Sequence, residues 1–377
     1  MITLLQHFNA IGHRIWLDGF SRGFVESREA SNLIAQGVTG ITTNPALFMQ
    51  ALADSHAYEE SLLSLYSRRD ALADIYDTLL CEDAARAADL LKSTYERTGS
   101  REGYVSIEVS PTVANDTNEM VRHARALISL AQRPNVMIKI PATPEGIAAI
   151  PLLVLEGINV NATLIFTVDT YEQVLLAYIS GLESRVARGK SIKTIASVAS
   201  IFVSRWDKLV DILIDNQRLP PRLEGKVGIA NAKLSYNLFS HYAKTPRVRA
   251  LISCGGQLQR PLWASMRAKG SGYPPLYYVQ SLAGPGSIST LPLATLNAAQ
   301  DSEPSYDPPS KSFSDAHRVI HTVESLGFSL ESLGAQLLQD GLTVFTAAYV
   351  TAVHHLAHLR EDYAIRKLRQ VGGAARK

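Results

Sequence analysis

This sequence has few cysteines, and neither positive nor negative charge is in large excess. Its 377 residues include two cysteines, Cys81 and Cys254, which are too few for a disulfide framework or a zinc-ligand set. The 37 Lys and Arg residues nearly balance the 35 Asp and Glu residues, so the net charge of +2 gives no reason to expect nucleic acid as a partner. We therefore expect a protein of the reducing cytoplasm.

Long hydrophobic runs are lacking as well. The N-terminal stretch MITLLQHFNAIGHR does not combine a charged segment with a long apolar core, so no secretory signal is expected. The longest apolar helix candidate, VFTAAYVTAVHHLAHL, is interrupted by histidines before it could span a bilayer. There is also no P-loop and no dinucleotide glycine fingerprint. The sequence therefore indicates neither a membrane partner nor a nucleotide cofactor.

The sequence does contain a regular alternation of β-rich runs and amphipathic helical runs, such as DAARAADLLKSTYERTG. This alternation favours parallel β/α units, and eight such units predict a closed (β/α)8 TIM barrel of the α/β class. The eight strands are expected at residues 13–18, 38–44, 104–110, 135–140, 158–166, 194–203, 262–267 and 276–280.

The chain is longer than the ~250 residues that such a barrel needs. Two long intervals and the C-terminal part account for the remainder. We expect a single barrel domain over residues 1–366, with helical insertions at about 46–103 and 205–260 and C-terminal helices from about residue 313. Residues 367–377 are expected to form a basic flexible tail.

A lysine stands in the middle of the fourth expected strand, NVMIKIP. Neighbouring side chains of a strand point to opposite faces, and one face of a barrel strand looks into the interior. Val136, Ile138 and Ile140 form an apolar face suited to lie beneath helices, so Met137 and Lys139 point inward. Because burial disfavours an ammonium ion, this position favours a neutral amine.

Polar inward-facing residues recur late in the other strands, at the end of the barrel where enzymes build active sites. Taken singly, each has a simpler interpretation, as a strand-edge lysine, a salt-bridge partner or a satisfied core group. The same arrangement in seven strands favours a catalytic or binding mouth. It contains no histidine and no metal-ligand set. Besides Lys139, the inward-facing residues that we single out are Asp18, Asn44, Glu108, Asn161, Thr163, Ser200, Phe202, Ser265 and Arg267.

These residue types fit aldol chemistry. A neutral amine attacks a carbonyl and forms a Schiff base, and the resulting iminium is an electron sink for cleavage of a nearby carbon–carbon bond. Asp18 and Glu108 supply two carboxylates for two proton-transfer tasks. Asn, Thr and Ser side chains match a polyhydroxylated chain, and Arg205 and Arg267 match a phosphate. The residues indicate a class I aldol enzyme acting on phosphorylated ketoses.

Eight stretches between about residues 11 and 296 carry a family resemblance. They are IWLDGFSR, GVTGITTNPALF, VSIEVSP, NVMIKIPATPEGIAAI, GINVNATLIF, SVASIFVSR, GKVGIANAKLSY and QRPLWAS. Together they resemble transaldolases, the Schiff-base enzymes of the pentose phosphate pathway, in their longer bacterial form. The resemblance implies a reversible transfer of dihydroxyacetone from sedoheptulose 7-phosphate to glyceraldehyde 3-phosphate, which gives erythrose 4-phosphate and fructose 6-phosphate. It implies no cofactor and no metal.

The resemblance also implies residue roles. Lys139 would form the Schiff base, and Asp18 would take the C4 hydroxyl proton during cleavage. Glu108 would act through a water held with Thr163 when the imine forms and hydrolyses. The residues that would bind the dihydroxyacetone unit are Asn44, Asn161 and Ser200. The residues that would hold the phosphate are Arg205, Ser265 and Arg267.

Two comparisons within this resemblance bear on specificity. The short fructose 6-phosphate aldolases carry Gln where Glu108 stands and Tyr where Phe202 stands, so both residues here favour transfer over release. The longer transaldolases read Thr-Gly where this chain has Met266 and Arg267, and Asp and Asn where YVQSLAGPGSISTLP has Gly286 and Ser289. A specialised sugar transaldolase of secondary metabolism, with an altered acceptor, is therefore the alternative function.

Other classes of function fit less well. His354 and His358 have the spacing of metal ligands on a helix, but surface or packing histidines are the better interpretation. A non-catalytic sugar-phosphate-binding barrel would lack the lysine or a carboxylate, and all three are present. A metal-dependent hydrolase would need inward His and Asp ligands, of which only Asp18 fits. A monomer and a homodimer are both open.

Overall fold

The strands close into a barrel. The computed structural model describes residues 3–53, 55–267, 273–300, 302 and 306–374. Eight strands pair in chain order, each parallel to its neighbours, and β1 pairs with β8, which confirms the predicted TIM barrel. They are β1 (Arg14–Asp18), β2 (Val38–Thr42), β3 (Tyr104–Glu108), β4 (Val136–Pro141), β5 (Asn159–Ile165), β6 (Ser197–Phe202), β7 (Arg260–Ala264) and β8 (Ile288–Leu291).

The eighth strand was predicted at the wrong place. Residues 276–280 fall largely in helix α14 (Tyr277–Leu282), and β8 lies further along the chain. The aromatic and β-branched residues there suggest a strand, but Tyr278, Val279 and Leu282 form one buried helical face. β8 has only four residues, between Gly286 with a φ of 78° and Pro292, so it is too short to show a periodicity.

The alternation of side chains separates two layers of core. Val136, Ile138 and Ile140 belong to the cluster between the strands and the outer helices, and Met137 belongs to the cluster that includes the barrel interior. Trp16 fills part of that interior. A Cβ at Gly40 would lie 2.4 Å from the Trp16 ring, so only glycine leaves room for the indole there. The predicted inward and outward faces of β4 are therefore confirmed.

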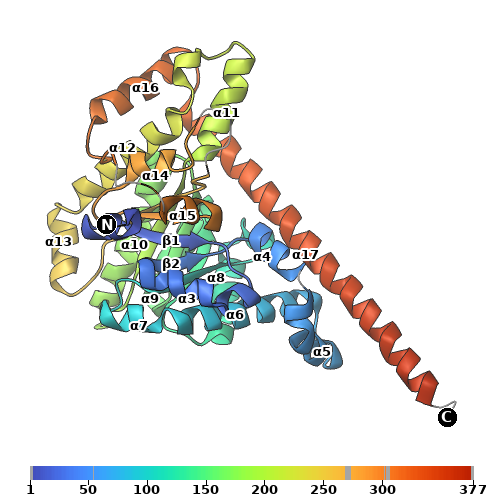
Figure 1. The fold of residues 1–377 in the computed structure, drawn as a ribbon. Helices are drawn as coiled ribbons and strands as arrows, with labels where there is room; N and C mark the ends of the chain where they lie inside the picture. Colours follow the sequence, from blue (N-terminus) through green and yellow to red (C-terminus); the bar gives the residue numbers. More distant parts are fainter. Residues whose placement is uncertain (1–2, 54, 268–272, 301, 303–305, 375–377) are drawn as a thin grey trace.

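Helices surround the barrel (Figure 1). Typical of them is α8, whose buried Met120, Ala124, Leu127 and Ala131 share one face and pack toward the strands. In chain order the helices are α1 (Leu4–Ala10), α2 (Arg22–Val25), α3 (Arg28–Gln36), α4 (Pro45–Leu52), α5 (Glu59–Ser67), α6 (Leu72–Leu90), α7 (Lys92–Arg97), α8 (Thr117–Ala131), α9 (Pro144–Glu156), α10 (Val168–Ala187), α11 (Ser204–Asp215), α12 (Val227–Tyr242), α13 (Pro246–Ser253), α14, α15 (Leu293–Gln300), α16 (Phe313–Ser325) and α17 (Leu330–Ala374). Short 3-10 helices are η1 (Ser55–Tyr58), η2 (Pro111–Val113) and η3 (Pro221–Leu223).

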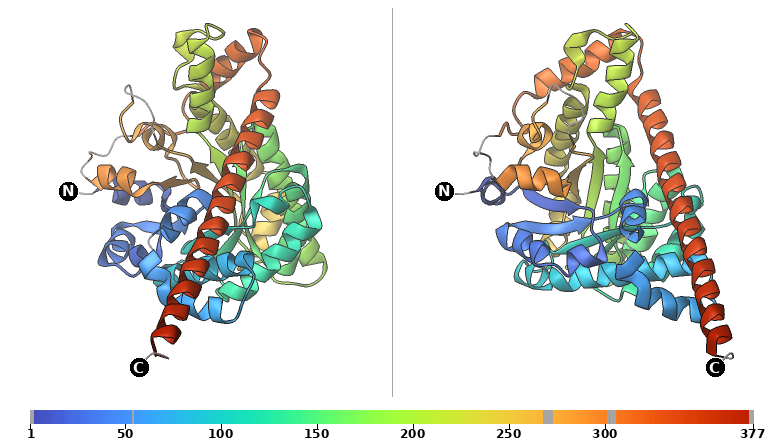
Figure 2. Two further views of the ribbon diagram at one scale, coloured as in Figure 1. Left: turned by 90° about the vertical axis from the view of Figure 1, so that its right-hand side faces the viewer. Right: turned by 45° about the vertical axis from the view of Figure 1, so that its right-hand side comes forward.

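The last helix, α17, is 45 residues long and crosses the barrel (Figure 2). It packs on α4, α6, η2 and β5, so it lies over the ends of the barrel where strands β2, β3 and β5 finish. Its backbone is helical through Ala374, which includes most of the expected basic tail, and residues 375–377 lie outside the described residues. The C-terminal part of the chain therefore contributes to the carboxyl end of the barrel.

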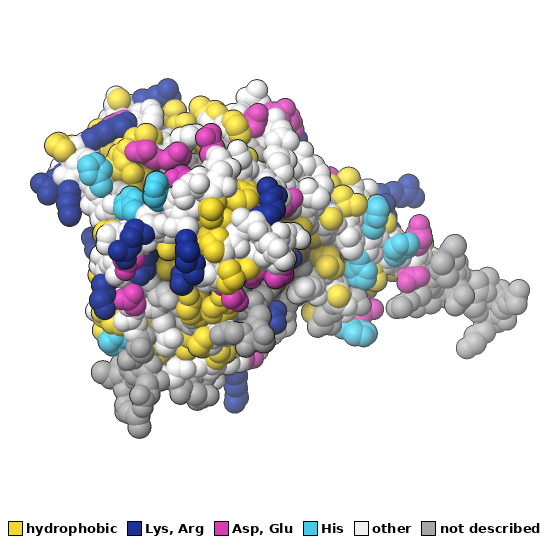
Figure 3. Space-filling view, turned by 90° about the horizontal axis from the view of Figure 1, so that it is seen from above, with side chains coloured by type: hydrophobic (Ala, Val, Ile, Leu, Met, Phe, Trp, Pro, Cys, Tyr) yellow, Lys and Arg dark blue, Asp and Glu magenta, His cyan; other side chains and the backbone are white. Residues whose placement is uncertain are grey.

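In the described part of the chain, no helix combines the length and apolar character of a bilayer-spanning segment. No group of three or more His, Cys, Asp or Glu side chains is arranged to hold a metal ion among the same residues. His354 and His358 are exposed on α17, whose projecting part carries histidines in the view from above (Figure 3). Charged side chains of both signs are spread over that face.

Candidate active site

Lys139 lies inside the barrel near the carboxyl ends of the strands. Its side chain is 7% exposed, and its Nζ donates hydrogen bonds to the Thr43 carbonyl at 2.8 Å and to Glu108 Oε1 at 3.1 Å. Strand register brings these groups together, because Glu108 on β3 and Asn161 on β5 are the direct neighbours of Lys139 on β4. The buried amine therefore has two polar partners, one of them a carboxylate.

The turn after Lys139 shows why the motif PATPEG has its composition. Thr143 caps α9 by accepting a hydrogen bond from the Gly146 amide at 3.0 Å, and Pro144 occupies the first turn. A Cβ at Gly146 would lie 1.9 Å from the Pro141 carbonyl oxygen, so glycine allows α9 to begin directly against the end of β4. This tight turn fixes the end of the strand that carries Lys139.

Two carboxyl groups share the field of Lys139. Burial is the largest effect on both and raises the pKa of Asp18 and of Glu108, while the positive charge of Lys139 opposes the rise in each pKa. Asp18 accepts a hydrogen bond from Thr42 Oγ1 at 3.0 Å, and the negative charge of Asp18 raises the pKa of Glu108 further. Carboxyl groups with raised pKa values, next to an amine, are suited to proton exchange.

A chain of buried polar side chains lies beside the amine. Asn161 donates from Nδ2 to Ser106 Oγ at 3.1 Å and accepts from Ser200 Oγ at 2.8 Å, which fixes the orientation of its amide. Ser106 is not among the residues singled out from the sequence. Thr163 is also buried, and its hydroxyl has no hydrogen-bond partner among the described residues. A buried hydroxyl without a partner is free to bind a water or a substrate group.

Asn44 and Phe202 complete this part of the site in different ways. Asn44 caps α4, because its Oδ1 accepts from the Ala46 and Leu47 amides at 3.1 Å, and its Nδ2 takes no part in the cap. Phe202 ends β6, is 8% exposed and packs on Phe166 with ring centroids 5.3 Å apart. The structure thus brings an amide from the turn after β2 and an aromatic ring from the end of β6 to the same end of the barrel as Lys139.

The expected phosphate residues lie after two adjacent strands. Arg205 is half-buried in the first turn of α11, and Arg267 is exposed three residues beyond the end of β7. Ser265 joins the two segments, since its hydroxyl bonds Ser204 Oγ at 2.9 Å and its carbonyl accepts from the Ser204 amide. Neither guanidinium has a hydrogen-bond or ion-pair partner within the described ranges. Residues 268–272, which follow Arg267, lie outside them.

A residue far along the chain also reaches the site. Tyr349 of α17 and Tyr76 of α6 line a cavity of about 10 Å³ together with Glu108 and Asn44, close to the lower limit for one water molecule. The two tyrosine rings meet edge to face, with centroids 4.9 Å apart. Burial, followed by the charge of Glu108, raises the pKa of Tyr76 well above its usual value. No local motif around Tyr349 indicates this role, because its position depends on how α17 docks.

A buried lysine beside two carboxyl groups at the carboxyl ends of a (β/α)8 barrel has the composition of a lysine Schiff-base enzyme. The profile of the family described as "Transaldolase/Fructose-6-phosphate aldolase" matches residues 15–356. The chain belongs to this family.

Curated relatives agree with this assignment. The chain is 36% identical over 365 residues to a protein named transaldolase from Trichodesmium erythraeum (strain IMS101), which covers 93% of this chain and 96% of that protein. It is 39% identical over 351 residues to "Transaldolase 1" of Streptomyces coelicolor, with 92% of each chain covered. It is 38% identical over 348 residues to a transaldolase of Neisseria gonorrhoeae, with 92% of this chain and 98% of that protein covered.

Proposed function

We propose that this protein is a transaldolase. It moves a dihydroxyacetone unit between sedoheptulose 7-phosphate or fructose 6-phosphate and an aldose phosphate, through a Schiff base on Lys139. The observation that carries the proposal is the position of Lys139 Nζ, buried in the barrel and 3.1 Å from a carboxylate whose pKa is raised by burial. The protein needs no metal and no cofactor for this reaction, because the iminium formed on the lysine is itself the electron sink.

The first half of the reaction cleaves the donor sugar. Glu108 takes a proton from the Lys139 ammonium, and the neutral amine attacks the ketose carbonyl to give a carbinolamine. Loss of water from the carbinolamine, with a proton delivered by Glu108, leaves the iminium. Asp18 then removes the proton of the C4 hydroxyl, the C3–C4 bond breaks, and its electron pair moves into the iminium to form an enamine. The aldose phosphate leaves as an aldehyde.

The second half reverses these steps on a different aldehyde. The enamine carbon attacks the acceptor carbonyl, and the protonated Asp18 gives its proton to the new hydroxyl. A water held by Glu108 and Thr163 hydrolyses the imine, and the unpartnered buried hydroxyl of Thr163 supports this role. Phe202 has no hydroxyl that could protonate the enamine, so the enamine persists until an acceptor arrives.

The remaining residues bind the sugar. Asn44, Asn161 and Ser200 surround the space next to Lys139 and bind the hydroxyls of the dihydroxyacetone unit. The phosphate lies further out, where a bidentate guanidinium contact fits its oxygens. Its binding residues are Arg205, Ser265 and Arg267.

The alternative of a specialised sugar transaldolase loses one of its two supports. The departures at Gly286 and Ser289 bear on acceptor choice only if these residues lie at the mouth of the barrel. Gly286 instead precedes β8, and Ser289 Oγ lies 3.1 Å from His13 Nε2, so both are at the amino end of the strands. Changes at that end do not touch an acceptor bound near Lys139. We expect the protein to act in the cytoplasm, as a single barrel domain that is a monomer or a homodimer.

Reductive trapping tests the proposal. Borohydride added with fructose 6-phosphate is expected to leave a dihydroxyacetone-derived mass on Lys139, detected by mass spectrometry of peptides. The matched control is Lys233→Met, because Lys233 is a second buried lysine, on α12, and is paired with Asp307 at 3.1 Å. The control should be labelled like the wild type. A label on another lysine, or a label that persists in Lys139→Met, contradicts the mechanism.

A further inference from the structure

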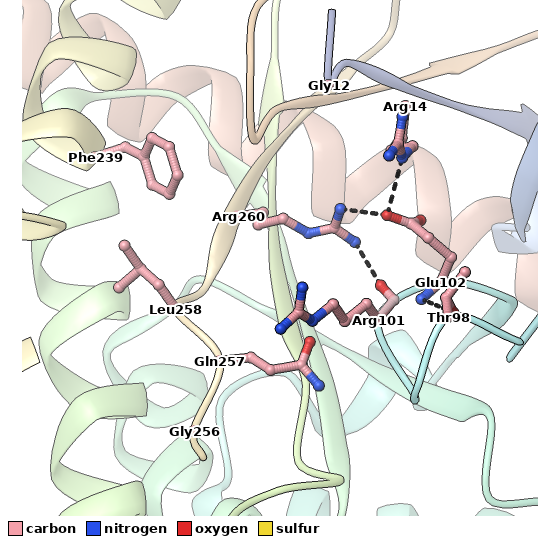
Figure 4. A pocket seen from close by; sticks show the side chains of 10 residues that line it. All are labelled: Gly12, Arg14, Thr98, Arg101, Glu102, Phe239, Gly256, Gln257, Leu258 and Arg260. Carbon is pink, nitrogen blue, oxygen red and sulfur yellow. Dashed lines mark hydrogen bonds and ion pairs between the residues drawn. The ribbon is translucent and has the colours of Figure 1, made fainter. Parts of the chain in front are cut away.

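A second cavity lies at the opposite end of the barrel from Lys139. It has a volume of about 520 Å³, within the range of small-molecule sites, and is formed by segments that precede β1, β3 and β7 together with α12 (Figure 4). Arg14 and Arg260 begin β1 and β7, respectively, so their side chains stand at the amino ends of the strands. The catalytic residues proposed above stand at the carboxyl ends, and the two sites share no residue.

The lining of this cavity has a surplus of positive charge. It contains three guanidinium groups, those of Arg14, Arg101 and Arg260, against the single carboxylate of Glu102, which leaves two positive charges. Guanidinium groups do not lose their proton in proteins, so the surplus persists at every physiological pH.

Glu102 is already fully engaged. Its side chain is 6% exposed, and Oε1 accepts from Arg260 at 2.6 Å and pairs with Arg14 Nε at 3.4 Å. Its other oxygen accepts from the Thr39 hydroxyl at 3.1 Å. Two guanidiniums thus share one carboxylate oxygen, and the carboxylate cannot neutralise both. An anion from solution that met the free side of these groups would be stabilised by the remaining charge.

Free donors remain on the arginines. Arg101 is exposed, and its guanidinium has no partner among the residues that the structure describes, although its carbonyl accepts from Arg260 at 3.0 Å. The side chains of Arg14 and Arg260 are 29% and 20% exposed. Figure 4 shows the three side chains converging on one space from different segments. They are therefore placed to contact one ligand together.

The opposite wall is apolar. Phe239 of α12 and Leu258, just before β7, line the cavity across from the arginines and are both half-buried. A site with a cationic wall and an apolar wall fits a molecule that has an anionic group at one end and an apolar or aromatic body at the other.

We propose that this cavity binds a small phosphomonoester with an apolar or aromatic body. The charge surplus favours phosphate over carboxylate, because a phosphomonoester carries about −1.5 to −2 at pH 7 whereas a carboxylate carries one charge. The phosphate contacts Arg14, Arg101 and Arg260, and the body packs on Phe239. The proposal does not rest on the Schiff-base function.

The test is a calorimetric titration of the full-length protein with phenyl phosphate, inorganic phosphate and benzoate. Phenyl phosphate should bind at this cavity more tightly than either probe, because inorganic phosphate lacks the apolar body and benzoate lacks the second charge. The Arg101 guanidinium has no partner among the described residues, so Arg101→Gln breaks no contact within the described part of the protein. This substitution should weaken phenyl phosphate binding about tenfold. Phe239→Ala should remove the advantage of phenyl phosphate over inorganic phosphate.

Two controls separate this site from other phosphate sites. Arg249→Gln changes an exposed arginine on the neighbouring helix α13 that does not line the cavity, and it should leave binding unchanged. Arg205→Gln, at the proposed catalytic end, should leave the Arg101-dependent binding unchanged. Binding that is lost in Arg205→Gln but kept in Arg101→Gln, or equal affinities for inorganic and phenyl phosphate, would overturn the proposal.

Discussion

The two ends of the barrel use similar groups in opposite proportions. At the carboxyl end, one amine lies in the field of two carboxyl groups, Asp18 and Glu108. At the amino end, two guanidiniums share the one carboxylate of Glu102. Glu108 is the last residue of β3, and Glu102 lies six residues earlier, just before that strand begins. Each pairs with a basic group from another strand, so the pairing itself does not distinguish a catalytic cluster from a binding one.

The difference lies in which groups can exchange a proton. An amine and a carboxyl with a raised pKa can pass a proton between them, whereas a guanidinium cannot give one up. At the end with Lys139, Asp and Glu side chains outnumber the basic group, which favours proton transfer. At the end with Glu102, guanidinium groups outnumber the carboxylate, which favours a fixed positive potential. The five predictions that follow test this contrast, from the largest expected effect to the smallest.

Removing the amine should abolish the reaction. Lys139→Met is expected to reduce transfer of dihydroxyacetone by at least about a thousandfold, because no other group can form the Schiff base. A coupled assay of fructose 6-phosphate formation measures the loss. Circular dichroism and a thermal melt should show an intact fold, since methionine fills the same space without a buried charge. Substantial turnover in this variant would remove Lys139 from the mechanism.

Removing the acid–base group should slow the reaction without abolishing it. Glu108→Gln is expected to reduce imine formation and hydrolysis about a hundredfold, the usual contribution of a positioned acid–base group. Single-turnover trapping with borohydride measures imine formation directly. Glu102→Gln, just before the other end of β3, is the matched control and should leave these rates unchanged. Equal rates in Glu108→Gln and wild type would contradict the assignment.

Glu102→Gln should instead lower stability. The substitution leaves Arg14 and Arg260 close together without their shared counter-charge, and breaking a buried pair on one side is destabilising. Both arginines are partly exposed, so we expect a loss of about 2 kcal/mol in the free energy of unfolding. Urea unfolding at pH 7 measures it. An unchanged midpoint would show that the pairs at this end do not stabilise the barrel.

The pH dependence of stability should differ in sign between the ends. Burial lowers the pKa of His13 to about 3, and the charges of Arg14 and Arg260 lower it too. Below the ordinary pKa of 6.5 the unfolded chain binds a proton that the folded chain does not, so stability falls as pH decreases from 6.5 toward 3. The expected slope is about 1 kcal/mol per pH unit. His13→Gln should flatten it in unfolding measured at several pH values.

Asp18→Asn provides the opposite case for the same measurement. The folded-state pKa of Asp18 is raised, so the folded chain holds its proton to a higher pH than the unfolded chain. The contribution of Asp18 to the free energy of unfolding therefore falls as pH rises from 3.8 through the raised pKa. Asp18→Asn should therefore stabilise the protein slightly at neutral pH while it removes cleavage activity. Parallel slopes for the two variants would show that the ends do not differ in this way.

The sequence predicts most of the site because period-two alternation decides which side chains enter a barrel. Lys139, Glu108 and Asn161 follow from that rule, and strand register makes them neighbours. The rule fails where a strand is short, as in β8, and where the partner is a backbone atom, as with the Thr43 carbonyl that binds Lys139. Neither a very short strand nor a contact with a backbone atom produces a pattern of residue types in the sequence.

The amino-end cluster and the α17 contribution were not predicted for a related reason. Glu102 lies in a connection before β3 and reaches Arg260, more than 150 residues away, only because the barrel closes. Tyr349 reaches the cavity beside Glu108 only when α17 docks across the strands. The positions of both residues depend on tertiary contacts. The division of the chain into one barrel domain with insertions stays a prediction.

The position of α17 also has a consequence for the order in which the protein is made. Chains emerge from the ribosome N-terminus first, at about 5–20 residues per second. All eight strands, which end at Leu291, are translated before any residue of α17, which begins at Leu330. The nascent chain therefore carries Lys139 before it carries the helix that packs over the carboxyl end of the barrel. A premature stop within α17 would release a chain that has every strand of the barrel and an incomplete wall beside Glu108.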